Sequence, residues 1–278
     1  MQRRPLLTAA LALLAAPALL TLTGCGDTSG GATSTGVEGG GTRTVTVGTE
    51  PTFPPFEMKD ENDVTVGFDI DLFKAIAADR GFTPDFRDVG FDSLIPSLAS
   101  GQIDVALSGM SITPERQQTV DFTDPYFNAG LVIAVRPGSE VAGVDDLAGK
   151  DVGVNIGTTG ATAAEGLASE GKVGSVKTFQ DVGLSMEALV AGKVDAVIND
   201  KPVSEAYANS RPGQVEILPE VLEADDYGMA VRKGNTELLE VLNEGLANVK
   251  ASGELDEIQA RWFGEDAPAV AEDAASAE

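Results

Sequence analysis

The sequence predicts an α/β fold with mostly parallel sheet, and three observations lead to this prediction. Segments typical of strands alternate with segments typical of helices along residues 43–264. An internal echo relates "PSLASGQIDVALSG" at 96–109 to "EALVAGKVDAVIND" at 187–200. Two short apolar strands, "VIAVR" at 132–136 and "GMAVR" at 228–232, bracket the second of these units. They indicate a crossover from one lobe to another and back, although recurrence within a single α/β domain also fits.

The first strand is predicted from alternating apolar and polar residues, and the first two helices from residues typical of helix ends. Residues 43–50 alternate as a strand does, and the prolines of the following "PTFPPFE" predict a loop. In "GFDIDLFKAIAADRG" we expect a helix capped by Asp69 and ended by Gly81. In "FDSLIPSLASG" we expect a second helix, capped by Asp92 and ended by Gly101.

Both ends of the chain have compositions that differ from the middle. Two arginines precede an apolar run that leads to "LTGC", so residues 1–24 are predicted to be a signal peptide, with a lipid on Cys25. A retained anchor helix and a twin-arginine signal are the alternatives. The stretch that begins with Cys25, residues 25–42, is rich in Gly, Ser and Thr and predicts a flexible tether, and 266–278 predicts a disordered tail.

Composition excludes several functions. Lysine and arginine number 19 against 44 aspartates and glutamates, and 19 − 44 gives a net charge of −25, which disfavours nucleic acid and anionic lipid as partners. The chain has no histidine, and its single cysteine is the predicted lipidation site. Catalytic triads with histidine, histidine–zinc sites and disulfides are therefore excluded.

A positively charged residue, Arg116, follows the polar turn that comes after the apolar run at 103–107. Thr113 is expected to cap a helix that begins at Pro114, with Arg116 in its first turn. The helix dipole disfavours a cation there, so Arg116 is expected to recognise an anion, and its planar fork suits a carboxylate. A surface arginine paired with Glu115 or Asp121 is the alternative.

Six segments together resemble the family 3 extracellular solute-binding proteins. They are "TEPTFPPFE", "VGFDIDLFKAIA", "FDSLIPSLASGQIDVALSGMSITPERQQTVDFTDPY", "DLAGKDVGVNIGTTG", "GKVDAVIND" and "ARWFG". The resemblance runs in order from Thr44 to Gly264. It implies a two-lobed, type II periplasmic-binding-protein-like fold, each lobe a mostly parallel sheet flanked by helices, joined by two hinge strands. Residues 43–133 plus 228–265 would form the first lobe and 134–227 the second.

The resemblance also implies a function and a site. The protein would capture a polar amino acid outside the cytoplasm and deliver it to an ABC permease, as a monomer anchored through Cys25, without cofactor, metal or nucleic acid. Arg116 would bind the α-carboxylate of the ligand and Asp200 its α-ammonium group. Further ligand-binding residues would be Glu50, Phe53, Phe91, Ser108, Gly109, Ser111 and Thr158. In this set the donors at 109, 111 and 158 would assist Arg116, the phenylalanines would cover the ligand side chain, and Glu50 and Ser108 would select it.

Alternatives remain for the site and the ligand. The two phenylalanines could be plain core, and Asp200 could only cap a helix. Asn155 and Asn199 stand where the glutamine receptors have lysine and histidine, which weakens glutamine. Glu50 favours a basic, arginine-like ligand, while glutamine or another neutral polar amino acid, glutamate and cystine stay open. No catalysis is expected, although a dehydratase-type enzyme with Glu50 as acid–base group, or a sensor module, could use the same scaffold.

Overall fold

The structure is a computed structural model, and it describes residues 43–264. The predicted signal peptide (1–24), the lipidation of Cys25, the tether (25–42) and the tail (266–278) lie outside the described residues. Among the helices of residues 43–264, none has the length and apolar character needed to cross a membrane.

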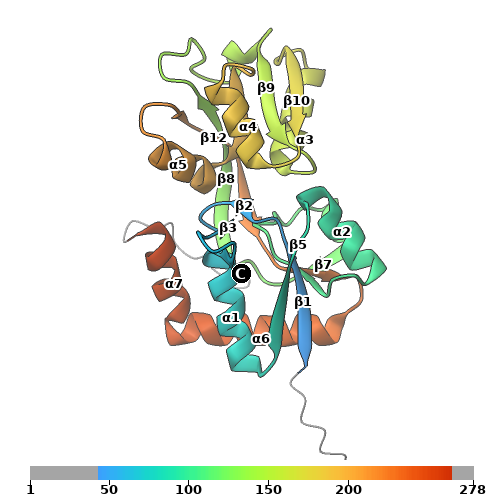
Figure 1. Cartoon of the computed structure of the whole chain (residues 1–278). Helices are drawn as coiled ribbons and strands as arrows, with labels where there is room; N and C mark the ends of the chain where they lie inside the picture. The colour runs from blue at the N-terminus through green and yellow to red at the C-terminus, as the bar shows by residue number, and fades with distance from the viewer. Residues whose placement is uncertain (1–42, 265–278) are drawn as a thin grey trace, which may run out of the picture. The chain divides into compact units, whose positions relative to one another are not determined.

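Residues 43–264 form two five-stranded sheets and one small three-stranded sheet (Figure 1). The first large sheet has the order β5 (Thr83–Asp88), β1 (Thr44–Thr49), β6 (Val105–Ala106), β13 (Ala230–Arg232), β7 (Val120–Phe122). The second has the order β10 (Ser175–Phe179), β9 (Asp151–Asn155), β11 (Ala196–Asp200), β8 (Phe127–Val135), β12 (Glu216–Tyr227). The small sheet contains β2 (Thr52–Phe53), β3 (Glu57–Lys59) and β4 (Thr65–Val66). We call the part built on the first large sheet the first lobe and the part built on the second the second lobe.

The two large sheets repeat one pattern. In the first, β1 pairs parallel with β5 and β6, while β13 pairs antiparallel with β6 and β7. In the second, β9 pairs parallel with β10 and β11, while β8 pairs antiparallel with β11 and β12. Strands β6 and β11, which the sequence echo relates, hold the same central place. The sheets are therefore mixed and not mostly parallel, because β13 in the first sheet and β8 in the second each run antiparallel to both of their neighbours.

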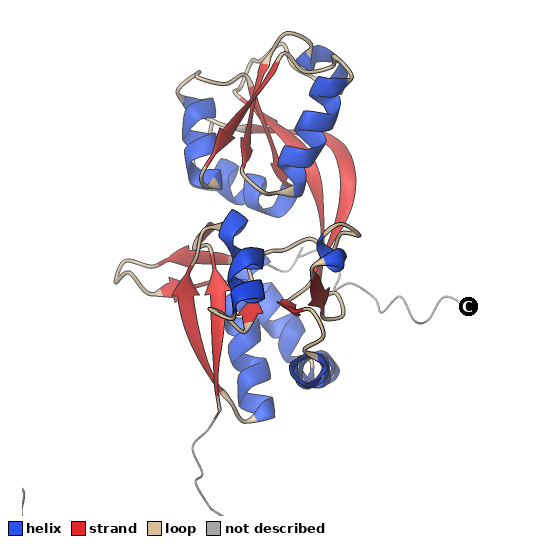
Figure 2. Cartoon of the chain, turned by 90° about the vertical axis from the view of Figure 1, so that its right-hand side faces the viewer, coloured by secondary structure: helices blue, strands red, loops and turns tan. Residues whose placement is uncertain are grey.

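Seven α-helices flank the sheets of the described part (Figure 2). In the first lobe α1 (Phe68–Arg80) packs on β5, α6 (Thr236–Ser252) and α7 (Glu254–Phe263), and α2 (Phe91–Ser100) packs on β1 and β6. In the second lobe α3 (Thr159–Ser169) and α4 (Val182–Val190) pack on β9 to β11, and α5 (Lys201–Ser210) packs on β8 and β12. Two 3₁₀ turns, η1 (Arg116–Gln118) and η2 (Val144–Leu147), complete the secondary structure.

Several predicted helix ends are right and others are wrong. Gly81 and Gly101 end α1 and α2 in the left-handed conformation, as expected. The caps are glycines, Gly67 and Gly90, and not Asp69 and Asp92, which lie inside the first turns. The helix expected after Thr113 is only the single turn η1, although the Thr113 hydroxyl does accept a hydrogen bond from Arg116 N at 3.2 Å.

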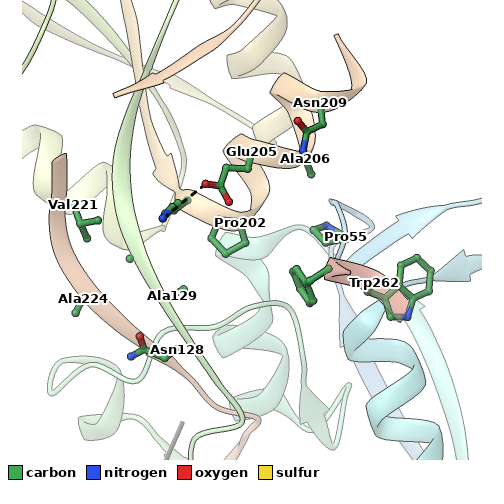
Figure 3. Close-up of a pocket in the computed structure, with 13 residues that line it drawn as sticks. Pro55, Asn128, Ala129, Pro202, Glu205, Ala206, Asn209, Val221, Ala224 and Trp262 are labelled. Carbon is green, nitrogen blue, oxygen red and sulfur yellow. Dashed lines mark ion pairs between the residues drawn. The ribbon is translucent and has the colours of Figure 1, made fainter. Parts of the chain in front are cut away.

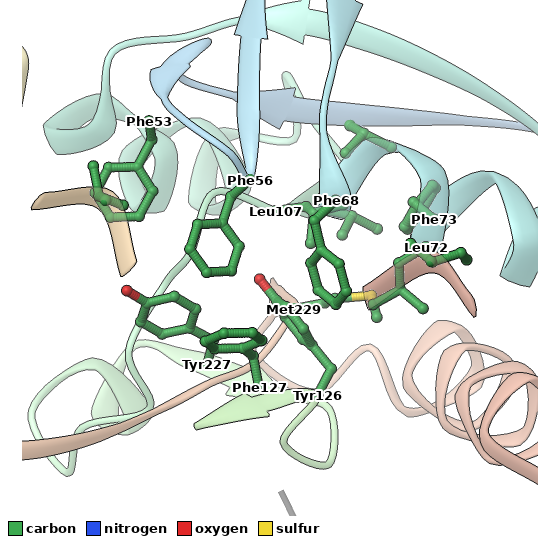
Figure 4. Packing of buried hydrophobic residues seen from close by; sticks show 14 of the residues in the cluster. Phe53, Phe56, Phe68, Leu72, Phe73, Leu107, Tyr126, Phe127, Tyr227 and Met229 are labelled. Atoms are coloured by element: carbon green, nitrogen blue, oxygen red, sulfur yellow. The ribbon is translucent and has the colours of Figure 1, made fainter. Parts of the chain in front are cut away.

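A dense aromatic cluster lies where the two long strands β8 and β12 enter the first lobe (Figure 4). Phe56 meets Phe127 edge-on at 4.9 Å between ring centroids and Tyr227 at 5.3 Å, and Phe127 stacks on Tyr227. All three rings are fully buried. Burial of this much aromatic surface fixes the base of both strands, so their ends beside the strand exits of the first lobe are rigidly placed.

Candidate functional site

The exits of four strands converge on one small cavity, which we call the central cavity. Glu50 follows β1, the turn 108–111 follows β6, Asn155 ends β9 and Asp200 ends β11. The lining residues are Glu50, Phe53, Phe91, Ser108, Gly109, Ser111, Arg116, Asn155, Thr158, Thr159 and Asp200. All nine residues expected from the sequence are therefore brought together. Loops at the carboxyl ends of parallel strands are where open α/β sheets gather ligand-binding groups.

Arg116 connects the two lobes. Its Nη1 donates to the carbonyl oxygen of Ser111 at 2.7 Å in the first lobe, and its Nη2 donates to the carbonyl oxygen of Gly157 at 3.0 Å in the second. The guanidinium carbon lies 5.3 Å from the centroid of the Phe91 ring, within the range of a cation–π contact. Asp121, one of the alternative partners, forms an ion pair with Lys233 at 2.6 Å. The guanidinium is thus held in a fixed orientation at the cavity.

The turn after β6 is held from behind by carboxylates. The Ser108 hydroxyl accepts from Glu50 N at 3.1 Å and donates to Glu57 Oε1 at 2.8 Å. Gly109 N donates to Asp69 Oδ2 at 2.9 Å. Gly109 has φ +51°, and a Cβ there would lie 2.6 Å from the Phe53 ring, so only glycine fits. The Gly109 amide therefore shapes the turn and is already bonded to protein.

Glu50 and Asn155 meet across the lobes. Asn155 Nδ2 donates to Glu50 Oε2 at 3.1 Å, and Phe91 N donates to Glu50 Oε1 at 3.3 Å. Glu50 is only 6% exposed, and burial raises its pKa to about 7, against the lowering effect of these two hydrogen bonds. Asn155 Oδ1 is buried and accepts no hydrogen bond from the described residues. Two acceptor oxygens, Glu50 and Asn155, are thus concentrated at one end of the cavity.

Asp200 occupies the matching exit in the second lobe. It is 4% exposed, and its Oδ1 accepts from the Tyr227 hydroxyl at 2.6 Å. It stands at the N-cap position of α5, but its side chain makes no capping hydrogen bond. The capping interpretation is therefore not what the structure has, and the carboxylate is held by a tyrosine from β12.

The remaining expected residues have mixed roles. Phe53 is buried and packs in the aromatic cluster as well as lining the cavity, so it is both core and cavity wall (Figure 4). Thr158 caps α3, accepting from Ala161 N at 3.1 Å, and donates to Asn155 O at 2.8 Å. Ser111 and Thr159 hydroxyls lie 3.3 Å apart and join the lobes at a third point.

Sequence reasoning missed Thr159 and noted Asn155 only as a departure from the glutamine receptors. The signal for Asn155 was available once strand order is known, because β9 is the second-lobe counterpart of β1. Asn155 at the end of β9 therefore corresponds to Glu50 after β1. Thr159 follows Thr158 at the start of α3, where nothing in its neighbours distinguishes it.

The central cavity has a volume of about 10 Å³, close to the space that one water molecule needs. Small-molecule sites usually enclose roughly 300 to 1,000 Å³. Its charged groups are one guanidinium and two carboxyl groups, which suits a small ligand carrying both signs of charge. No group of three or more His, Cys, Asp or Glu residues suited to a metal occurs in residues 43–264.

A larger pocket of about 670 Å³ lies between α5, the long strands and the end of α7 (Figure 3). Trp262 and Phe263 pack against the core and also line this pocket. Its charged residues, Lys201 and Glu205, are half-exposed and pair with each other at 3.8 Å. None of the expected binding residues lines it, and it lacks the convergent buried polar groups of the central cavity.

Two known proteins resemble this chain over most of its length. A probable histidine-binding protein of Neisseria gonorrhoeae is 34% identical over 248 residues, which cover 88% of this chain and 91% of that protein. The arginine-binding extracellular protein ArtP of Bacillus subtilis (strain 168) is 34% identical over 257 residues, covering 91% of this chain and 96% of that one.

Solved structures show the same fold. An ancestral arginine-binding protein bound to arginine is 47% identical with a TM-score of 0.77, over 80% of this chain and 98% of that chain. The ancestral amino acid-binding protein AncCDT-1, a precursor of cyclohexadienyl dehydratase, is 36% identical with a TM-score of 0.73, over 79% and 95%.

One family model matches nearly all of the described residues. The sequence model of the bacterial extracellular solute-binding proteins, family 3, matches residues 45–265. Together with the two-lobed fold and the relatives above, this match establishes that the chain belongs to the family 3 bacterial extracellular solute-binding proteins.

Proposed function

We propose that this protein is the substrate-binding component of an ABC importer and that it captures a basic amino acid, with arginine as the best fit. The observation that supports the proposal is the convergence of Arg116 and Asp200, from equivalent strand exits of the two lobes, on one cavity. The head of a free amino acid carries one negative and one positive group. Arg116 binds the α-carboxylate with its planar fork, and Asp200 binds the α-ammonium group.

The side-chain preference rests on Glu50 and Asn155, which also line the central cavity. The Glu50 carboxylate and the Asn155 amide oxygen are acceptors from different lobes. A guanidinium offers five donors in one plane and can bond to both, and the rings of Phe53 and Phe91 provide faces on which it stacks. A neutral amide side chain would leave the ionised Glu50 without a compensating charge, so glutamine binds more weakly.

Ligand entry requires the lobes to separate. A cavity of about 10 Å³ does not admit an amino acid, and three contacts close it: Arg116 to Gly157, Asn155 to Glu50 and Ser111 to Thr159. We place the hinge in the two connecting strands, with residues 43–133 plus 228–265 moving against 134–227. Small-angle scattering should give a smaller radius of gyration with arginine than without it; an unchanged radius would argue against this motion.

The proposal includes where in the cell the protein is located. Cleavage after residue 24 and lipidation of Cys25 would anchor the protein to the outer face of the cell membrane, with residues 25–42 as the tether, so that the loaded monomer reaches its permease. Mass spectrometry of the membrane-extracted protein should find a diacylglycerol-modified cysteine at the N-terminus, and an unmodified N-terminus that begins at Met1 would contradict the anchor.

Thermal unfolding with candidate ligands tests the function directly. The panel contains the twenty amino acids, cystine and ornithine. A ligand at one hundred times its dissociation constant adds about 2.7 kcal/mol of apparent stability. We expect arginine to give the largest shift, with lysine and ornithine next. A shift with glutamine or a dicarboxylate, and none with the three basic amino acids, would overturn the ligand assignment.

A dehydratase-type enzyme is the second candidate, favoured by one observation. The pKa of Glu50 is raised to about 7 by burial, which suits a general acid or base at neutral pH. Incubation of the best ligand with the protein, followed by mass spectrometry, separates the two candidates. We expect the ligand to be recovered unchanged, and conversion would establish the enzyme instead.

A further inference from the structure

Two carboxyl groups lie buried behind the turn 108–111, outside the central cavity. Glu57 is on β3 and Asp69 is in the first turn of α1, and both side chains are fully buried. Neither side chain lines the central cavity, so neither carboxyl group can contact the ligand directly. The proposed ligand contacts therefore do not explain them.

Three donors account for only half of the four carboxyl oxygens. Glu57 Oε1 accepts from the Ser108 hydroxyl at 2.8 Å. Asp69 Oδ2 accepts from Gly109 N at 2.9 Å and from the Tyr126 hydroxyl at 2.8 Å. Glu57 Oε2 and Asp69 Oδ1, both buried, receive no N–H or O–H donor from the described residues. One unused oxygen thus remains on each carboxyl group.

The surroundings favour keeping a proton on this pair. Burial is the largest cause that raises the pKa of both groups, and the neighbouring charge of Asp69 raises the pKa of Glu57 further. The nearby carboxyl group of Glu50 also raises the pKa of Glu57, whereas the hydrogen bonds from Gly109 and Tyr126 lower the pKa of Asp69 without outweighing burial. Two facing carboxylates in a buried site cannot both be ionised without a large energetic cost.

We propose that Glu57 and Asp69 share a single proton between Glu57 Oε2 and Asp69 Oδ1, and that this protonated pair positions Ser108 and Gly109 in the wall of the central cavity. One proton satisfies both unused oxygens at once. The pair then acts as a rigid bracket: Glu57 fixes the Ser108 hydroxyl, which in turn accepts from Glu50 N, and Asp69 fixes the Gly109 amide. These are positioning residues, and they act through the turn and not on the ligand.

A shared proton makes an unusual prediction for amide substitutions. In Glu57→Gln the amide NH₂ replaces the shared proton and donates to Asp69, while the amide oxygen keeps Ser108. In Asp69→Asn the amide NH₂ donates to Glu57, and the amide oxygen keeps Gly109 and Tyr126. In the double variant two NH₂ groups face each other, and neither finds an acceptor.

A double-mutant cycle of thermal unfolding on the ligand-free protein tests this. We expect each single variant to fold and the double variant to melt at least about 5 °C below the sum of the single effects, or not to fold. Glu240→Gln with Asp124→Asn, two exposed carboxylates, is the control and should be additive. Failure of either single variant to fold, additivity in the Glu57–Asp69 cycle, or a double variant more stable than the single ones would each overturn the shared proton.

The pH dependence provides a readout that packing alone would not change. Because the folded protein keeps a proton that the unfolded chain loses near pH 4.5, the stability of the wild type falls as pH rises toward the folded pKa of the pair. Glu57→Gln should remove one proton from this linkage between pH 6 and 8. Glu50 contributes the same sign in both proteins and cancels in the comparison. An unchanged proton count would overturn the proposal.

The positioning role rests on the proposed function and is measured with arginine by calorimetry. Glu57→Gln should bind within about threefold of the wild type, whereas Glu57→Leu, which leaves Ser108 without its acceptor, should bind at least tenfold more weakly. Equal losses in both variants, or none in either, would overturn the positioning role. If the wild type does not bind arginine, the proposed function fails, while the unfolding cycle still decides on the shared proton.

Discussion

The exits of β6 and β11 are the same structural unit with opposite chemistry. Both strands are central in their sheets and pair parallel on one side and antiparallel on the other. Their sequences, within 96–109 and 187–200, are similar to each other. The first-lobe exit leads through the turn 108–111 to the cation Arg116. The second-lobe exit ends on the anion Asp200, held by Tyr227. A repeated backbone unit thus positions side chains, while the residues placed on it decide which charge is recognised.

The ends of β1 and β9 also hold equivalent places in the two sheets but carry different side chains. Glu50 after β1 and Asn155 at the end of β9 hold equivalent places, and they hydrogen bond to each other at 3.1 Å. One brings a carboxyl group and the other an amide. The two lobes therefore contribute complementary groups to the central cavity twice, and the contact between Glu50 and Asn155 forms only when the lobes meet.

Removing the cation of the first-lobe exit should give the largest effect on ligand affinity. We expect Arg116→Ala to weaken arginine binding by ~100-fold, about 3 kcal/mol, because the ligand carboxylate would be buried without a partner. Arg87→Ala, at an exposed arginine on β5, is the control and should leave affinity unchanged. Calorimetric affinity of Arg116→Ala within a few fold of the wild type would refute the assignment.

Neutralising Glu50 should change which ligand side chain the protein prefers. Glu50→Gln should weaken arginine by ~30-fold, about 2 kcal/mol, since the guanidinium loses a charged acceptor. Glutamine binding should stay the same or strengthen in this variant. The prediction fails if the two ligands lose affinity equally, because that would assign Glu50 a purely structural role.

The titration of Glu50 should make arginine binding depend on pH. Its pKa is raised to about 7 by burial, and a cationic ligand requires the ionised form. Protons therefore compete with arginine below pH 7, and affinity should fall about tenfold from pH 8 to pH 6. Glu50→Gln should show a flatter profile. An affinity that rises as pH falls would contradict this sign.

The smallest effect is expected at the support of the second-lobe anion. Tyr227→Phe removes the hydroxyl that donates to Asp200 at 2.6 Å while keeping the ring in the aromatic cluster. Loss of one hydrogen bond of this kind costs about 1 kcal/mol, so arginine should bind ~5-fold more weakly. Affinity equal to that of the wild type would show that Asp200 needs no support from β12.

The sequence was sufficient for the features that depend on local signals. Gly81 and Gly101 end helices because only glycine enters the left-handed conformation freely, and such stops are visible from the pattern. The cap at Asp69 was wrong because its carboxylate is taken by Gly109 and Tyr126, which are 40 and 57 residues away. Competition between a local and a distant partner cannot be decided from spacing.

The residues of the candidate site also fall into two groups, those that the sequence predicted and those that required the three-dimensional structure. Nine of the eleven residues that line the cavity were expected because the family resemblance spans the chain, whereas Asn155 required the strand order of both sheets. Its contact with Glu50 joins positions 105 residues apart. The mixed sheets were likewise missed, because a short apolar strand reads the same whether its neighbour runs parallel or antiparallel.

The most direct test pairs Arg116 with the ligand group that it is proposed to bind. Agmatine is arginine without its α-carboxylate, so calorimetry of arginine and agmatine on the wild type and on Arg116→Ala completes a double-mutant cycle. We expect agmatine to bind the wild type ~100-fold more weakly than arginine, and Arg116→Ala to bind both ligands with similar affinity. Equal, additive losses from the two changes would mean that the guanidinium and the carboxylate do not meet, and would contradict the account.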